Sequence, residues 1–283
     1  MKIATWNING VRARLEGAVQ WLRDAAPDIL CFQEIKSEDT NFPREADAAP
    51  DVLCFQEIKS EDTNFPREAF GDLGYNIALN GQKGFNGVAI LSKVPFDEVS
   101  RTLPGDDSDS HARFIEAVFS VRSGALRVAS LYFPNGNPPN SDKFPYKLAW
   151  MERFAAYAKA RLAAEEMVVM GGDYNVIAEP EDARNPAAWV SDALFQPETR
   201  AAYRRLLNLG LTDAFRACHG EPGHYTFWDY QAGAWQKNNG ILIDHILLTP
   251  LAADRLQTAS IDKRTRGWDK PSDHVPVVIE LDV

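Results

Sequence analysis

Cysteine is scarce in this chain of 283 residues, which has only Cys31, Cys54 and Cys218. An odd number of cysteines without metal-ligand spacing argues against a disulfide framework and against a structural zinc site. The chain also lacks an apolar signal core near its start and any apolar run as long as a membrane helix. These absences predict an ordinary globular protein of the cytoplasm.

An excess of basic residues is missing as well. The chain has 30 Lys and Arg residues and 40 Asp and Glu residues, which gives a net charge of -10. Such a charge argues against holding nucleic acid by bulk electrostatics, although it permits a local basic face. Surplus carboxylates suit a protein that carries a divalent cation to its substrate. The sequence contains neither a phosphate loop of the Gly-x-x-x-x-Gly-Lys type nor a serine or cysteine nucleophile motif.

A tandem duplication is the oddest feature of the sequence. Residues 25–46 recur as residues 48–69, and the only difference is Ile29 against Val52. Two near-identical copies indicate a duplication rather than an array of stacked repeats, so we expect one copy to be surplus. If the first copy forms the buried strand, the connection from the preceding helix stays short and about residues 37–59 form a loop outside the sheet, which is the arrangement we expect. The alternative is that the second copy forms the strand.

Apolar periodicity alternates between helix and strand along both halves of the chain, which favours a layered α/β sandwich over an all-β or all-helical fold. Residues 175–197 contain three prolines and are expected to form a surface loop. Strands are expected at 2–8, 28–35, 75–79, 87–92, 113–121, 126–133, 167–170, 241–249 and 275–283, and helices at about 15–25, 148–162 and 198–209.

The stretch Met167-Val168-Val169-Met170-Gly171-Gly172-Asp173-Tyr174-Asn175 joins a run of apolar residues to a turn with two polar residues. Its apolar half predicts a buried strand, and the paired glycines allow a tight turn after it. Asp173 and Asn175 then project to the same side at the carboxyl end of the strand, where ligands bind in open α/β sheets. The alternative is a simple Asx-turn, which Asp and Asn favour for local reasons.

Polar residues also end other apolar runs. Asn7 lies in a predicted strand, where asparagine is disfavoured, and we expect a functional role for it. Glu34 and its duplicate Glu57 each end a predicted buried strand, unless they are merely exposed at its rim.

A carboxylate in the run Ile241–Leu248 and a histidine before the last strand form another pair. Asp244 needs a partner if it is buried. Asp273 and His274 precede the last strand, and His274 is the titrating group that Asp244 could orient. Several oxygen ligands of this kind indicate a Mg²⁺ or Mn²⁺ site that meets substrate phosphate, and the reaction they support is hydrolysis by metal-assisted water attack.

These motifs together resemble the exonuclease III or abasic-site (AP) endonuclease family of the endonuclease/exonuclease/phosphatase superfamily. The resemblance rests on WNINGVRAR, LCFQEIK, GQKGFNGVAILSK, LYFPNG, GGDYN, TFWDY, LIDHILLT and KPSDHVPV. It implies one catalytic domain over residues 1–283, a four-layer α/β sandwich with two mixed β-sheets packed face to face and flanked by helices. It also implies a monomeric, Mg²⁺-dependent (Mn²⁺ possible) DNA repair hydrolase. Its expected reactions on double-stranded DNA are cleavage 5′ to abasic sites and 3′→5′ exonuclease trimming of 3′ ends.

The resemblance assigns roles to individual residues. The metal ligands are expected to be Glu34 or Glu57, with Asn7 and Asp273 nearby. The catalytic positions are Tyr132, Asp173, Asn175, Asp244 and His274, and the substrate-binding ones are Arg113 at a DNA phosphate and the aromatic pair Phe227 and Trp228 at the abasic sugar. The chain departs from the family at Leu242, where an arginine is usual, and in the duplication beside Glu34.

Two other functions stay open at this point. A phosphatase or lipid phosphodiesterase could use the same fold, although an aromatic pair suits a base-free sugar better than a lipid headgroup. A non-catalytic DNA-binding protein, impaired by the duplication, is the other alternative, which the acidic charge and the retained Asp173, Asp244 and His274 disfavour.

Overall fold

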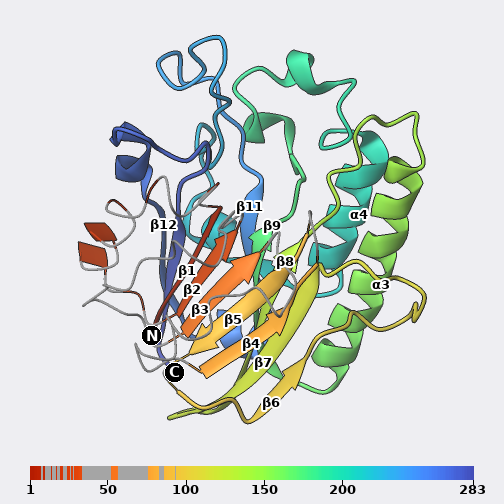
Figure 1. Ribbon diagram of the computed structural model, residues 1–283, viewed down its shortest axis with the longest axis vertical. Helices are drawn as coiled ribbons and strands as arrows, with labels where there is room; N and C mark the ends of the chain where they lie inside the picture. Colours follow the sequence, from red (N-terminus) through yellow and green to blue (C-terminus); the bar gives the residue numbers. More distant parts are fainter. Residues whose placement is uncertain are drawn as a thin grey trace.

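The computed structural model describes residues 1–7, 9, 14, 17, 20–21, 24–25, 27, 29–33, 52–56, 76–82, 86–92 and 94–283, with 29–33, 52–56, 77 and 91 described by their backbone. Within these residues the strands form two mixed sheets (Figure 1). The first contains β1 (Lys2–Asn7), β2 (Ile29–Gln33), β3 (Val52–Gln56), β4 (Asn76–Asn80), β5 (Val88–Ser92), β12 (Leu256–Ile261) and β13 (Val277–Leu281). Its strand order is β12-β13-β1-β2-β3-β5-β4.

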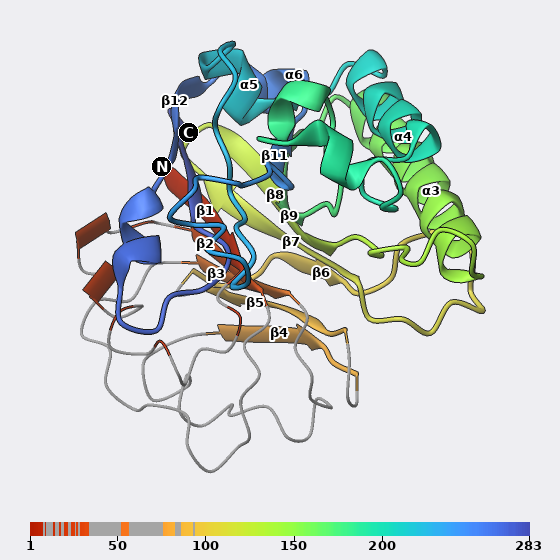
Figure 2. The ribbon, with the colours of Figure 1, turned by 90° about the horizontal axis from the view of Figure 1, so that it is seen from above.

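The second sheet contains β6 (Glu98–Ser100), β7 (Phe114–Val121), β8 (Gly124–Tyr132), β9 (Met167–Asp173), β10 (Thr212–Asp213) and β11 (Asp244–Leu248). Its strand order is β10-β11-β9-β8-β7-β6. The two sheets pack face to face, with β1 against β9 and β5 against β7 (Figure 2). One hydrophobic core fills the space between them, and its members include Ile3, Val88, Ile115, Val169 and Val277.

Helices cover the outer face of the second sheet. These are α3 (Lys143–Ala163) and α4 (Pro197–Asn208), which lie side by side in Figures 1 and 2. Strand β9 is buried on both faces, because Val169 faces the core between the sheets and Val168 faces the helices. This explains the continuous apolar run that predicted the strand. No helix in the described part of the chain has the length and apolarity needed to cross a bilayer.

The predicted layered α/β sandwich is confirmed. Gly17, Trp21 and Ala25 have helical backbone, and Trp21 packs 5.4 Å from Trp6 between ring centroids, against β1. The predicted strands are found with small shifts at their ends, whereas β3, β6, β10 and β12 were not predicted. Strands β6, β10 and β12 are short or at sheet edges, where fewer apolar residues are required. The remaining elements are α5 (Ala214–Cys218), α6 (Pro250–Ala253), and the 3₁₀ helices η4 (Pro180–Asp182), η5 (Pro186–Trp189) and η6 (Lys263–Gly267).

Two predictions about loops were wrong. Residues 175–197 are not simply a surface loop, because Ile177 and Leu194 are buried and η4 and η5 lie within this segment. Residues 37–59 are not all looped out, because β3 lies inside that range. Both copies of the duplication form strands, and β2 and β3 pair in parallel with Ile29 opposite Val52. Two copies with the same pattern can both be seated because an open sheet can gain a strand.

Candidate active site

Two carboxylates face each other across neighbouring strands of the second sheet. Asp173 is the last residue of β9 and Asp244 the first of β11, and the antiparallel register sets them directly opposite. Both are buried. Like charges in this position are destabilising, so a cation or a cationic side chain is required beside them. His274 is such a partner, since its ligand atom and those of the two aspartates all lie within 4.8 Å of one another.

His274 is oriented by Asp244. The ring Nδ1 lies 2.8 Å from Asp244 Oδ2, so Nδ1–H donates to the carboxylate and Nε2 takes no part in this hydrogen bond. Burial disfavours the imidazolium, but the charge and hydrogen bond of Asp244, followed by the charges of Asp273 and Asp173, outweigh it and raise the pKa of His274 to about 10. The ring also packs against Phe227 at 4.9 Å between centroids.

Asn175 occupies a strained turn directly after β9. Its φ of 50° lies in the left-handed region that non-glycine residues rarely adopt. Hydrogen bonds hold it there: its backbone N–H donates to Asp173 Oδ1 at 2.9 Å, its Nδ2 donates to Phe133 O at 3.1 Å, and its Oδ1 accepts from Asn135 Nδ2 at 3.1 Å. The carboxamide is therefore fixed beside the Asp173 carboxylate.

A buried lysine supports this turn from helix α3. Lys147 is 0% exposed, and its Nζ donates to Asn175 O at 2.5 Å and to Asn135 O at 3.1 Å. Desolvation lowers the pKa of Lys147 to about 7, although the nearby Asp173 charge opposes this. Sequence reasoning missed Lys147. The available signal was a charged residue at helical spacing before Met151 on the apolar face of α3.

Tyr132 and Arg113 lie on the other side of Asp173. Tyr132 ends β8 and pairs in register with Asp173. The guanidinium of Arg113 lies 4.9 Å from the centre of the Tyr132 ring and 5.9 Å from that of Tyr146. Both Arg113 and Tyr132 are partly exposed, so this cation–π pair forms a rim beside the buried carboxylates.

Asn7 and Asp273 are brought together through Asn9. Asn9 donates its backbone N–H to Asn7 Oδ1 at 3.1 Å and its side-chain amide to Asp273 Oδ1 at 2.8 Å. The Ser272 hydroxyl donates to Asn7 O at 2.6 Å and thereby ties the end of β1 to the segment before β13. Two buried atoms here, Asn7 Nδ2 and Asp244 Oδ1, have no hydrogen-bond partner among the residues that the structure describes.

Trp228 is fully buried, and its indole lies edge-on to Trp235 at 4.9 Å, so the expectation that it meets the substrate alongside Phe227 is wrong for this structure. It belongs to a buried cluster with Tyr225, Ala234 and Val275. Glu34 and Glu57 lie outside the described residues. Leu242, at the departure from the family pattern, is 1% exposed and belongs to the core between the sheets.

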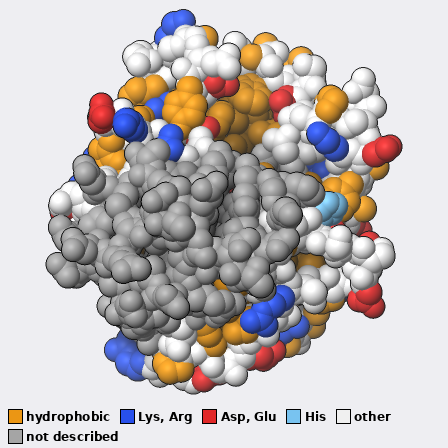
Figure 3. All heavy atoms as spheres, in the orientation of Figure 1, with side chains coloured by type: hydrophobic (Ala, Val, Ile, Leu, Met, Phe, Trp, Pro, Cys, Tyr) orange, Lys and Arg blue, Asp and Glu red, His pale blue; other side chains and the backbone are white. Residues whose placement is uncertain are grey.

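An apolar cluster adjoins the site. It joins the partly buried Trp189, Phe195 and Phe227 to the buried side chains Ile177, Ala183, Leu194, Ile241 and Ile243. Figure 3 shows a hollow lined by hydrophobic side chains on the face of the molecule drawn in Figure 1, with acidic side chains near its edge. Trp189 and Phe195 were not predicted as site residues, because no local motif connects them with Phe227.

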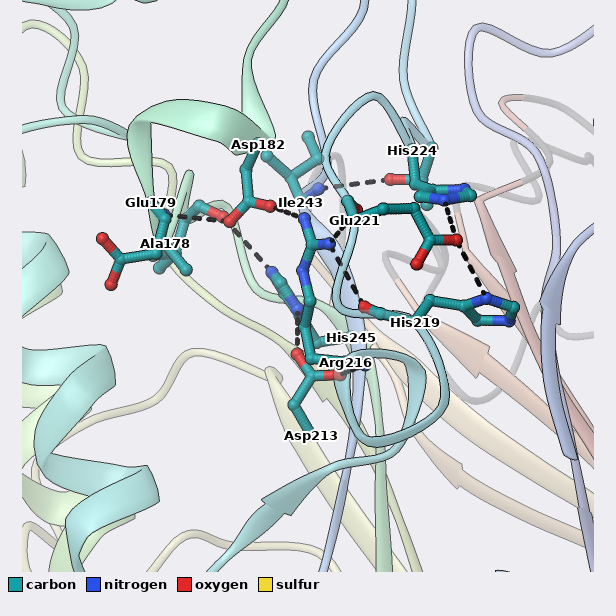
Figure 4. A network of polar contacts seen from close by, with 12 residues as sticks. Ala178, Glu179, Asp182, Asp213, Arg216, His219, Glu221, His224, Ile243 and His245 are labelled. Carbon is teal, nitrogen blue, oxygen red and sulfur yellow. Dashed lines mark hydrogen bonds and ion pairs between the residues drawn. The ribbon is translucent and has the colours of Figure 1, made fainter. Parts of the chain in front are cut away.

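A second buried histidine, His245, lies behind the site on β11. Its Nδ1 is 2.9 Å from Asp213 Oδ2 (Figure 4), its Nε2 is 3.3 Å from Val176 O, and the Tyr203 hydroxyl donates to Asp213. Desolvation opposes the imidazolium, but the Asp213 hydrogen bond and charge outweigh it and raise the pKa of His245. Because neighbours on a strand alternate, His245 anchors the outer side of the strand whose inner side carries Asp244.

The chain is similar to known proteins over its whole length. The model of the endonuclease/exonuclease/phosphatase family matches residues 4–274. Exodeoxyribonuclease III of Haemophilus influenzae is 32% identical over 289 residues, which cover 99% of this chain and 100% of that protein. An AP endonuclease structure from Archaeoglobus fulgidus has a TM-score of 0.82 at 34% identity. A 3′ phosphatase from Neisseria bound to a product DNA hairpin has a TM-score of 0.84 at 32% identity, and both structural alignments cover 100% of each chain.

Proposed function

Because this chain belongs to the endonuclease/exonuclease/phosphatase family, we propose that it is a DNA repair phosphodiesterase that cuts double-stranded DNA 5′ to abasic sites and trims 3′ ends. The observation that supports this most is the buried cluster of Asp173, Asp244 and His274 at one end of the second sheet. The named activities of the three relatives, all directed at nucleic acid, agree with it. We take residues 1–283 to act as a single catalytic domain and as a monomer.

The donor groups at the site fit a hard divalent cation. Carboxylate and carboxamide oxygens from Asp273, Asn7 and a glutamate are the ligands that Mg²⁺ accepts while it keeps several waters, and Mn²⁺ accepts the same set. The buried Asp244 Oδ1, which has no partner within the described ranges, adds negative charge that a nearby cation offsets. When bound, the ion supplies charge neutralisation to the phosphate oxygens.

Strand order favours Glu34 over Glu57 as the metal carboxylate. Strand β2 lies next to β1, and Gln33 pairs with Asn7. Strand β3 lies one place further from β1, with Gln56 paired to Gln33. Because neighbouring strands are about 4.8 Å apart, the strand that leads to Glu57 lies about twice as far from Asn7 as the strand that leads to Glu34. We therefore assign the metal-binding role to Glu34.

The remaining side chains hold and polarise the phosphodiester. His274, fixed through Nδ1 by Asp244, presents Nε2 to a phosphate oxygen, and Asp173 accepts the proton of the attacking water. Asn175 uses one N–H of Nδ2 for Phe133 O and has a second N–H for phosphate. The Tyr132 hydroxyl is a further donor.

Substrate contacts outside the reacting phosphate follow from the rim. Arg113, stacked on Tyr132, meets a DNA phosphate. The partly exposed Phe227, Trp189 and Phe195 offer an apolar surface to a sugar that lacks its base. This apolar surface disfavours a charged inositol or lipid headgroup as substrate, and the intact carboxylate and histidine cluster disfavours a purely DNA-binding role.

Cleavage of a defined duplex tests the proposal. We expect the purified chain with Mg²⁺ to cut a duplex with one abasic site analogue and to leave the matched intact duplex uncut at that position. Excess chelator should abolish the cleavage, and Asp173→Asn should abolish it while binding of the duplex persists. Cleavage that continues undiminished in chelator would refute the metal-dependent mechanism, and faster hydrolysis of a phospholipid headgroup would favour the alternative substrate.

A further inference from the structure

Two histidines and a glutamate form a cluster away from the proposed nuclease site, in the loop after α5. His219, Glu221 and His224 offer ligand atoms that all lie within 4.8 Å of one another. His224 Nε2 lies 3.0 Å from Glu221 Oε1, and His219 Nδ1 lies 3.5 Å from the same oxygen. Figure 4 shows both rings turned toward the Glu221 carboxylate. Three donor atoms therefore converge on one point at the surface.

The orientation of His219 identifies which of its nitrogens faces this point. Its Nε2 lies 2.7 Å from Ala259 O in β12, and since a carbonyl oxygen only accepts, Nε2 carries the hydrogen. In the neutral ring Nδ1 is then a lone pair that faces the Glu221 oxygen. Two acceptors this close repel unless a proton or a metal ion lies between them. Donation of the distant ring N–H to a backbone carbonyl is also the usual support of a metal-binding histidine.

Neighbouring residues hold the cluster in shape. The buried Phe215 ring stacks on His219 at 4.6 Å and meets His224 edge-on at 5.1 Å. The Arg216 guanidinium donates to the backbone carbonyls of His219 and Glu221, at 3.5 and 3.0 Å. Arg216 is itself held by a short ion pair with the buried Asp182, which is also drawn in Figure 4. The loop therefore does not have to be ordered by a ligand, which lowers the cost of binding.

We propose that His219, Glu221 and His224 bind a transition-metal ion, with Zn²⁺ as the expected occupant. Two imidazole nitrogens and one carboxylate are a ligand set that suits Zn²⁺, and they differ from the all-oxygen sets that suit Mg²⁺. Three protein ligands leave a fourth position for water. Glu221 is exposed and both histidines are partly exposed, so the ion can exchange with solvent. This site is independent of the proposed nuclease function.

The bound ion would join two parts of the fold. Through His219 it is linked to Ala259 of β12, and through His224 to the segment that continues to Phe227. We therefore expect Zn²⁺ to stabilise the folded chain and to fix the start of that segment, because an ion that binds only the folded state raises its stability by mass action.

Calorimetric titration with Zn²⁺ in saturating Mg²⁺ tests the site. His224→Gln and Glu221→Gln should each weaken binding by at least about 10-fold. The matched control is His111→Gln, which removes an imidazole of similar exposure, 37% against 32% for His219 and 27% for His224, that pairs with the carboxylate of Asp109. This control should bind Zn²⁺ like the parent. Unchanged binding in the two site variants would overturn the proposal.

Imidazole nitrogen NMR of the unaltered chain gives an answer that does not depend on how the variants fold. The chain has five histidines. On addition of Zn²⁺ the Nδ1 resonance of His219 and the Nε2 resonance of His224 should take the shifts of metal-bound nitrogens, while His111 and His245 keep theirs. Shifts confined to His274 would place the ion in the nuclease site instead and would count against this proposal, as would no shift at all.

Discussion

Replacing Lys147 by methionine tests whether a buried amine supports the turn that carries Asn175. Methionine has a similar length and no charge, so the change removes the ammonium and its two hydrogen bonds with little change in volume. A pKa of about 7 in place of 10.5 means that the folded state disfavours the ammonium by about 5 kcal/mol, since one pKa unit corresponds to 1.36 kcal/mol. Lys147 is completely buried, so solvent screening does not reduce this figure greatly.

The sign of the pH dependence follows from proton uptake. Between pH 7 and 10.5 the unfolded chain keeps a proton on Lys147 that the folded chain has released, so stability rises with pH in this window. The gain from pH 7 to 9 is about 2 kcal/mol. His245 and His274 have raised pKa values, and their contribution is full below pH 6.5 and is lost as the pH rises through those values. Only the difference between parent and variant therefore isolates Lys147.

Urea unfolding at pH 7, 8 and 9 measures this difference. The free energy of unfolding of the parent, minus that of Lys147→Met, should grow by about 2 kcal/mol from pH 7 to 9. Lost hydrogen bonds to Asn135 O and Asn175 O cost about 1–3 kcal/mol each in the variant at every pH. Lys143→Met, which changes an exposed lysine in the first turn of the same helix, should leave the pH dependence unaltered. Parallel stability curves for the parent and Lys147→Met would show that Lys147 stays charged in the folded chain and refute the reasoning.

Other predictions concern the proposed reaction itself. His274→Ala and Asp244→Asn should each lower kcat by roughly 10²-fold or more, and the double variant should lose much less than the product, because one residue orients the other; multiplicative losses in single-turnover cleavage would separate them. Glu34→Gln should abolish Mg²⁺-dependent cleavage and Glu57→Gln should leave it nearly intact, whereas the reverse pattern would assign the metal to the second copy. Phe227→Ala should weaken discrimination between abasic and intact duplex, and equal losses on both substrates would contradict a contact with the exposed sugar.

Local sequence determined most of the regular elements. The apolar run before Gly171 predicted β9. Helix α4 ends at Asn208, close to the predicted end at 209, and Gly210 follows it with a φ of 111°. Hydrophobic periodicity and turn residues involve positions that are close together in the chain, so a single sequence is enough to predict these elements. The motifs also pointed to Asp173, Asp244 and His274, because polar residues at the ends of buried strands conflict with the pattern around them.

Only the tertiary structure decided which of these residues lie close together and which other residues hold them in position. Asp173 and Asp244 are 71 positions apart, and only the register of β9 with β11 sets them opposite each other. Lys147 reaches Asn175 from a helix earlier in the chain, and Trp228 is buried by contacts that no spacing reveals. The duplication is the clearest case. The two copies differ by one methylene, and this difference in apolar area is too small to decide which copy forms a strand. Pairing with β1 on one side and β5 on the other gives each copy its own place in the sheet.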